Sequence, residues 1–243
     1  MISSFHSTSY PPLLCSSDLL RFWTTLGPIG EVIAVMENSS DYRVTNVEQL
    51  RAIMGEPGKL TPLKLLTELD DTAIDFIQRS PFLVLSTADA DGNQDASPKG
   101  DGPGFVAIED RNTLLIPDRK GNKLLFGLEN ILANPRVGIL FITPPTVETL
   151  RVNGTAELIA DPQILERLAA RGQPAQLAIR VTVRECFFHC AKAFIRSQLW
   201  NHQQWPHPVK ISFGNYLAGK MNAGADVAQQ IDTFVEQDYK TNL

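Results

Sequence analysis

The chain has 243 residues, and its 22 Lys and Arg against 27 Asp and Glu give it a formal net charge of −5. Hydrophobic residues make up 43% of the chain and charged residues 20%. This composition is typical of a globular protein and excludes a disordered chain, a collagen-like repeat and a coiled coil. Because binding to a nucleic-acid backbone needs clustered Lys and Arg, we do not expect this acidic chain to bind nucleic acid.

Cysteine content and targeting signals indicate the compartment. Three cysteines are too few for a disulfide framework in a chain of this length, so we expect reduced thiols and a cytoplasmic location. No run approaches the roughly 18 apolar residues of a membrane span, and we expect no contact with a membrane. The first residues lack the basic region of a secretory signal, and Pro11 and Pro12 interrupt their apolar part.

The residue pattern divides the chain into four regions. Residues 1–40 are a poorly defined N-terminal extension, because Ser, Thr, Pro and Gly interrupt its short apolar pieces. Residues 41–80 are a helical lead-in, in which Val47–Met54 and Pro62–Arg79 have the apolar spacing of helices. Residues 81–205 hold short apolar runs separated by turns, and residues 206–243 are a C-terminal tail that could form helices.

Region 81–205 is the one that specifies a fold. Short apolar runs predict strands, and a stripe at i, i+4 and i+7 predicts a helix. In chain order we expect strands at Phe82–Thr87, Gln94–Pro98, Phe105–Ile108 and Thr113–Ile116, a helix at Asn122–Ala133, strands at Val137–Thr143 and Glu148–Ile159, a helix from Asp161 to Ala170, and a strand from Ala178 towards Cys190. Strict strand–helix alternation is absent, which argues against a parallel sheet. The predicted class is therefore mainly β with helices (α+β), as an antiparallel barrel with helices outside.

The segment Pro117–Lys123 is the strongest candidate for a binding site. It carries Arg119, Lys120 and Lys123 just before the expected helix. A helix start attracts anions through its free N–H groups and its dipole, and Arg119 and Lys123 would add charge-assisted hydrogen bonds. The segment therefore predicts a phosphate site, and the alternative interpretation is an exposed basic turn.

Two further segments admit a ligand or a purely structural role. Ser97–Gly104 holds three glycines and two prolines after a predicted strand, so its backbone could approach a planar ligand or form a surface loop. In Arg151–Gly154, Arg and Asn alternate along a strand, and Gly154 permits a bulge or a close approach. Both interpretations stay open for each segment.

The run Cys186–Cys190 contains two cysteines and His189, which are metal-ligand types. On a strand the two cysteines would share one face and His189 would point to the other. Three ligands would not converge on one ion, and no fourth ligand follows at metal-finger spacing. We therefore expect no metal and interpret the cysteines as small buried hydrophobic residues.

Several ordered motifs together resemble those of the FMN-binding proteins related to pyridoxamine 5'-phosphate oxidase. The resemblance covers roughly residues 44–205, and it depends on the runs Phe82–Gly92, Asp95–Asp101, Ile116–Lys123, Asn130–Phe141, Leu150–Ala156 and Phe187–Trp200. The last of these runs is similar to one uncharacterised branch of the superfamily. The substrate-phosphate signature of the oxidase itself has no counterpart in Trp200–Trp205, which argues against oxidation of vitamin B6.

The resemblance implies a split β-barrel that binds FMN between the two subunits of a homodimer. It places the FMN phosphate at Arg119, Asn122 and Lys123, and the flavin ring along Ala96–Lys99. It also makes Arg196, Ser197 and Trp200 candidates for contacts from the partner subunit. The candidate cofactor-binding residues are Ser97, Lys99, Arg119, Asn122, Lys123, Arg151, Arg196, Ser197 and Trp200.

Two main functions are compatible with these residues. The first is an FMN-dependent oxidoreductase that passes electrons between a nicotinamide or other small-molecule donor and an acceptor; in such enzymes the flavin carries out the chemistry. The second is a non-catalytic flavin-binding or redox-sensing module. A haem or deazaflavin binder on the same barrel is a less favoured third option.

Overall fold

The computed structural model describes residues 42–121 and 123–242, and the expected extension 1–40 lies outside them. The chain divides into two compact units, residues 1–62 and 63–243. In the described part of the first unit, helix α3 (Val47–Met54) has the bounds that its apolar spacing predicts. Asn46 caps it, because its side chain accepts a hydrogen bond from the backbone N–H of Gln49.

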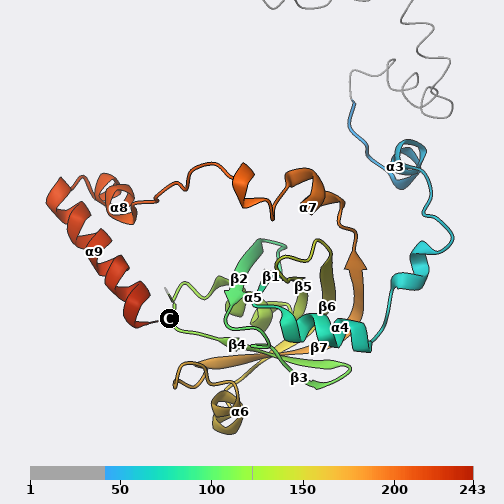
Figure 1. Ribbon diagram of the computed structural model, residues 1–243, viewed down its shortest axis with the longest axis horizontal. Coiled ribbons are helices and arrows are strands. Elements are labelled where there is room, and N and C mark those ends of the chain that lie inside the picture. Colours follow the sequence, from blue (N-terminus) through green and yellow to red (C-terminus); the bar gives the residue numbers. More distant parts are fainter. Residues whose placement is uncertain (1–41, 122, 243) are drawn as a thin grey trace, which may run out of the picture. The chain divides into compact units, whose positions relative to one another are not determined.

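The second unit contains the sheet and the remaining helices (Figure 1). Its strands are β1 (Phe82–Ala88), β2 (Gln94–Gly100), β3 (Ala107–Asp110), β4 (Thr113–Asp118), β5 (Arg136–Ile142), β6 (Thr149–Ile159) and β7 (Leu177–His189). Its helices are α4 (Asp71–Arg79), α5 (Phe126–Ala133), α6 (Pro162–Arg167), α7 (Lys192–Ser197), α8 (Phe213–Met221) and α9 (Ala225–Thr241). The order of strands and helices from β1 to β7 confirms the expected sequence of elements.

The seven strands form one antiparallel sheet in the order β2-β1-β5-β6-β7-β4-β3. β2 and β3 are its edges, so backbone hydrogen bonds do not close the sheet. This arrangement confirms the predicted α+β class and the split barrel. Apolar side chains at alternate strand positions meet in one core, whose fully buried members include Leu83, Ile116, Phe141, Leu150 and Ile179.

The helix expected over Pro62–Arg79 is shorter than its apolar spacing indicates. A 3₁₀ turn at Thr61–Lys64 is followed by extended chain, and α4 begins only after Asp70, whose carboxylate accepts a hydrogen bond from the backbone N–H of Ala73 at 2.8 Å. Between them, Leu66 and Cys186 exchange two backbone hydrogen bonds of 3.0 and 2.8 Å. This pairing with β7 over a long sequence separation replaces the local helical bonds that the spacing alone would favour.

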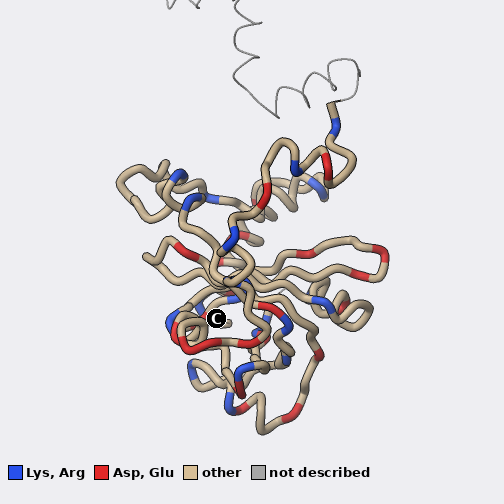
Figure 2. Tube along the Cα trace, turned by 90° about the vertical axis from the view of Figure 1, so that its right-hand side faces the viewer, with Lys and Arg blue, Asp and Glu red and all other residues tan. Residues whose placement is uncertain are grey.

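The C-terminal tail contains the helices α8 and α9, which pack against each other. Ser212 caps α8, and Asp232 of α9 accepts hydrogen bonds from the Ser212 hydroxyl at 2.6 Å and from the Gly214 backbone N–H at 2.8 Å. Of the helices in the described ranges, none is both long and apolar enough to cross a membrane. Figure 2 shows basic and acidic residues interspersed along the described chain.

Gly154 marks a β-bulge in the longest strand pair. The register between β6 and β7 shifts between Asn153 and Gly154, as the glycine within a strand permits. A Cβ atom at Gly154 would lie 2.2 Å from the backbone oxygen of Thr182. The close approach of two backbones therefore accounts for this glycine, which supports the structural interpretation of the segment.

We predict that Gly154→Ala destabilises the fold, because the added methyl group forces two paired strands apart. The expected loss in free energy of unfolding is about 1–3 kcal/mol, as for overpacking in other cores, measured by urea denaturation. Gly102→Ala is the matched control, since a Cβ atom there would meet nothing within 4 Å. Equal stability of the two variants would contradict the close approach.

Candidate functional site

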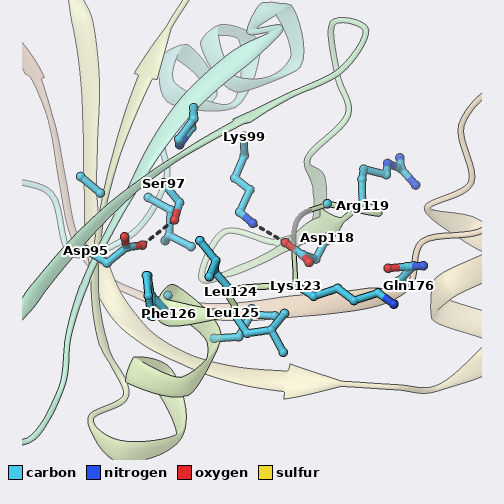
Figure 3. A pocket seen from close by; sticks show the side chains of 16 residues that line it. Asp95, Ser97, Lys99, Asp118, Arg119, Lys123, Leu124, Leu125, Phe126 and Gln176 are labelled. Atoms are coloured by element: carbon cyan, nitrogen blue, oxygen red, sulfur yellow. Dashed lines mark hydrogen bonds and ion pairs between the residues drawn. The ribbon is translucent and has the colours of Figure 1, made fainter. Parts of the chain in front are cut away.

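A pocket of about 340 Å³ lies beside the edge strand β2 (Figure 3). Most of its lining comes from three parts of the chain: β2, the end of β4 with the residues that follow, and the segment leading into α5 with the first turn of this helix. Leu85 of β1 and Gln176, just before β7, complete it. Its polar side chains are Asp95, Ser97, Lys99, Asp118, Arg119, Lys123 and Gln176. Leu124, Leu125 and Phe126 form an apolar wall, and each of them is at least half exposed.

Strand β2 supplies a polar face to this pocket. Asp95, Ser97 and Lys99 are half-buried, whereas the residues between them are exposed, as expected from the alternation of side chains along a strand. The Ser97 hydroxyl donates to the Asp95 carboxylate. Pro98 lies between Ser97 and Lys99, and a proline within a strand is tolerated at a sheet edge because it donates no ladder hydrogen bond.

Lys99 forms an ion pair with Asp118 at the end of β4. The Lys99 and Asp118 side chains are only 20% and 14% exposed, so both charges are largely removed from water. β2 and β4 are not neighbours in the sheet. The ion pair is therefore a side-chain link between two strands that share no backbone hydrogen bonds.

Arg119 forms a second link of the same kind. Its Nε donates to Asp101, just beyond β2, at 3.2 Å. Arg171 donates to the other carboxylate oxygen of Asp101 at 2.9 Å. The Arg119 side chain points away from the Lys99–Asp118 pair (Figure 3). Its Nη1 is buried without a hydrogen-bond partner, so this guanidinium has an unused donor.

Helix α5 begins at Phe126 and not at Asn122, which corrects the expected helix Asn122–Ala133. Lys123 and Leu125 have φ values of 62° and 58°, in the left-handed region that a right-handed helix excludes. Arg119 and Lys123 therefore lie in a loop before the helix. Because a helix dipole acts mainly within the first turn, side-chain charge and not the dipole makes the surroundings of Arg119 favourable for anions. Asn122 lies outside the described residues.

The first turn of α5 lies against β2. A Cβ atom at Gly127 would be 3.0 Å from Asp95 Oδ2 and 3.3 Å from Ser97 Oγ, so the glycine permits this close packing. Farther along the helix, the Asn130 side chain donates to the hydroxyl of Thr87 on β1 at 3.1 Å. Both contacts hold α5 over β1 and β2, and they position the apolar wall at the mouth of the pocket.

The region of the chain that matches a known protein family includes this whole sheet. A family model described as pyridoxamine 5'-phosphate oxidase matches residues 69–190, which is half of the chain and includes β1 to β7. The chain belongs to the pyridoxamine 5'-phosphate oxidase family.

Similar solved structures cover about half of this chain. HupZ of Group A Streptococcus is 19% identical with a TM-score of 0.41, over 49% of this chain and 93% of HupZ. General stress protein 26 of Bacillus anthracis is 16% identical with a TM-score of 0.38, over 47% of this chain and 88% of that protein. An FMN-binding protein of Syntrophomonas wolfei is 9% identical with a TM-score of 0.37, over 48% of this chain and 88% of that protein. A search among curated proteins found no match.

The other candidate site residues of this family member do not line the pocket. Arg151 lies on β6 with its guanidinium 5.2 Å from the ring centre of Phe187. In and just after α7, the Ser197 hydroxyl donates to the Phe194 backbone oxygen at 3.2 Å, and Trp200 Nε1 donates to the Thr146 backbone oxygen at 2.8 Å. Arg196 lies in the last turn of α7. Within one chain, only Ser97, Lys99, Arg119 and Lys123 of the candidates described come together.

The cysteines and the histidine near the end of β7 lie in different surroundings. Cys186 is fully buried in the core, its thiol donates to the Glu68 backbone oxygen at 3.2 Å, and burial raises its pKa to about 11. Cys190 is exposed. Burial, Arg151 and Lys64 lower the pKa of His189, which favours a neutral ring. In the described part of the chain, no three potential ligands gather in one place.

The sequence alone pointed to the cations of the site but not to their carboxylate partners. Asp118 directly precedes Arg119, and Asp101 closes the segment that contains Lys99, so both acids lie within the motifs already considered. The signal that could have singled them out is the need of half-buried cations for a counter-charge. Gln176 lies 53 residues beyond Lys123 in the chain, and no local pattern connects it to the pocket.

Proposed function

We propose that the protein binds FMN in the pocket beside β2 and functions as an FMN-dependent oxidoreductase. The observation that carries the proposal is the pocket's two-sided lining. Leu124, Leu125 and Phe126 offer an exposed apolar wall, while Lys99, Arg119 and Lys123 supply positive charge. FMN has the same division, because it joins an apolar ring system to a phosphate. Membership of the pyridoxamine 5'-phosphate oxidase family supports the same assignment.

The residues present fit this cofactor. Two carboxylates, Asp95 and Asp118, offset part of the charge of the three cations that line the pocket. The buried Arg119 Nη1 has no partner, so a donor is available to a phosphate. The volume of about 340 Å³ is near the lower end of the ~300–1,000 Å³ typical of ligand pockets. The edge of β2 extends the site for the ring.

When bound, the flavin supplies the electron-transfer chemistry. In this proposal the chain positions the ring along Ala96–Lys99 and holds the phosphate end with cations. The ammonium of Lys99 beside the ring favours added negative charge there. The apolar wall of Leu124–Phe126 excludes water from one side of the site. A nicotinamide or another small molecule would donate the electrons, in the cytoplasm.

The proposal includes a homodimer with FMN at its interface. Leu124 and Leu125 just before α5, Phe126 at its start and Leu132 near its end each expose half or more of their surfaces. Exposed apolar residues of this kind are commonly covered by a partner. Arg196, Ser197 and Trp200 would then reach the pocket of the second subunit.

We predict a dimer in sedimentation velocity for the FMN-loaded protein. Leu132→Glu, on the exposed face of α5, should shift the protein towards monomer, because it places a charge in the apolar contact. Leu60→Glu is a control with a leucine of the same 75% exposure at a position outside the sheet unit. A monomer that binds FMN at full occupancy would contradict the shared site.

The cofactor assignment predicts that FMN binds more tightly than riboflavin. Loss of two charge-assisted hydrogen bonds to the phosphate should weaken binding on the order of a hundredfold. The measurement is quenching of flavin fluorescence in titrations with FMN, riboflavin and FAD. Equal affinity for FMN and riboflavin would exclude a phosphate site here.

Turnover of the bound flavin by NADH or NADPH tests the oxidoreductase function. Absence of turnover would favour a non-catalytic flavin-binding module.

The ion pair of Lys99 with Asp118 allows a matched test. Lys99→Met and Asp118→Asn both break the pair, so both should lower the thermal midpoint of the protein without FMN. They change the charge of the pocket in opposite directions, however. We predict FMN binding about three- to tenfold weaker in Lys99→Met and stronger by a similar factor in Asp118→Asn, as expected for one charge near a phosphate. A change of the same sign in both variants would indicate a purely structural role for the pair.

A further inference from the structure

The C-terminal helices α8 and α9 lie outside the residues that match the family model, which ends at residue 190. The two helices pack against each other, and we call residues 212–242 the C-terminal hairpin. Residues 206–211 join it to the preceding chain. They are all exposed and belong to no helix or strand. Contacts of the hairpin itself, rather than this linker, therefore hold it to the rest of its unit.

Contacts within the C-terminal hairpin make it one packed body. Gly214 of α8 meets the backbone of Ala228 on α9, where a Cβ atom would lie 1.9 Å from the Ala228 oxygen. Asp232 of α9 accepts a hydrogen bond from the Gly214 backbone N–H at 2.8 Å. The end of the linker is fixed to α9 as well, because Lys210 forms an ion pair with Glu236 at 3.0 Å. A contact made by the end of α9 is therefore supported by the whole hairpin.

The end of α9 contacts the loop that follows β4. The Lys120 ammonium donates to the side-chain oxygen of Asn242 at 2.8 Å. Asn242 is the C-cap residue of α9. Its side-chain amide donates to the Asp238 carboxylate at 2.6 Å, and its backbone N–H donates to the Asp238 backbone oxygen at 2.9 Å. Two bonds to α9 thus fix the oxygen that receives Lys120.

The loop after β4 depends on side-chain contacts of this kind. Residues 119–121 and 123–125 form no helix or strand. Asp101 accepts a hydrogen bond from Arg119 at 3.2 Å, and Asn242 accepts one from the neighbouring Lys120. Arg119 and Lys123 of this loop line the pocket beside β2. A binding site on a loop is precise only where neighbouring residues hold the loop in place.

A cavity of about 430 Å³ connects the surroundings of this contact to the pocket. Thr241 and Asn242 line it together with Arg119, Lys120 and Gln176, among others. Arg119 and Gln176 also line the pocket beside β2. The end of α9 is therefore close enough to influence the loop at the pocket without lining the pocket itself.

We propose that the C-terminal hairpin is a strap that holds the loop after β4 in its ligand-binding conformation, with Asn242 as a positioning residue that acts through Lys120. The inference rests on the proposed function in that the ligand of the loop is FMN. Release of the strap would weaken FMN binding, because a loop that is free beforehand has to be ordered when the ligand binds.

The first measurement is hydrogen exchange of the loop amides, at residues 119–121 and 123–125, in the full chain without FMN. Asn242→Ala removes the acceptor of Lys120, so these amides should exchange about three- to tenfold faster, as for the loss of one hydrogen bond that opens the loop locally. Asn222→Ala is the matched control. Asn222 is the C-cap residue of α8, and in the described part of the chain it forms no hydrogen bond with this loop.

Two further variants separate the contact from a general effect on α9. Lys120→Met should speed loop exchange as much as Asn242→Ala does, and the two changes together no more than either alone, because both remove the same bond. Asp238→Asn combined with Asn242→Asp exchanges an amide and a carboxylate, which keeps a hydrogen bond between these two residues and an acceptor for Lys120. This combination should restore slow exchange. The thermal midpoint of each variant checks that it is folded.

The second measurement is FMN affinity, which should be about three- to tenfold weaker in Asn242→Ala and restored in the Asp238→Asn, Asn242→Asp combination. Faster loop exchange and weaker FMN binding in Asn242→Ala, with neither in Asn222→Ala, support the strap. Unchanged loop exchange in Asn242→Ala, an equal increase in Asn222→Ala, additive effects with Lys120→Met, or unchanged FMN affinity while the loop is released would overturn it. If the unaltered protein binds no FMN, the proposed function fails, and loop exchange alone decides whether the hairpin is a strap.

Discussion

The ion pairs that join the two ends of the open sheet are the interactions on which the rest of this structure depends. β2 is one edge strand, and β4 lies next to the other edge, so no backbone hydrogen bonds connect them. Lys99–Asp118 and Arg119–Asp101 cross this gap with side chains alone. The gap would otherwise be an open seam in the barrel, and these pairs make it a pocket with charged walls.

The same cations therefore have a structural role and, in our proposal, also a binding role. Their side chains are at least three-quarters buried, and removing one partner of a buried ion pair is costly because it leaves the other charge without compensation. An incoming phosphate can satisfy Lys99 or Arg119 only by sharing it with a carboxylate. A surface cation, as the alternative interpretation of Pro117–Lys123 assumed, would bind an anion without this competition, but it would also contribute little to the fold.

The sequence predicted the strands well because apolar alternation on a sheet is a local signal. The signals for the helix Val47–Met54 and for a helix start at Asp161–Pro162 were also local, and the structure confirms both. Two expected helices begin later than predicted, and for the first of them the cause is non-local. Leu66 pairs with Cys186, 120 residues away in the chain, and this pairing shortens the expected helix before β1.

At the second error, Leu124 and Leu125 fit a helical stripe but lie in a loop with left-handed residues, where they line the pocket. The candidate site was likewise predictable only in part. Arg119 and Lys123 stand out in the sequence, whereas the pairing of Lys99 with Asp118 follows from a strand order that a single sequence does not reveal.

Asp101 explains how Arg119 can take part both in the fold and in the proposed binding site. A carboxylate this buried needs several donors, and Asp101 has three: Arg119 Nε at 3.2 Å, Arg171 Nη1 at 2.9 Å and the Gly102 backbone N–H at 3.0 Å. Because Arg119 contacts it through Nε, the opposite side of the guanidinium is not used for this bond. The buried Nη1 is left without a hydrogen-bond partner. The contact that fixes the arginine through Nε thus leaves its Nη1 donor unused.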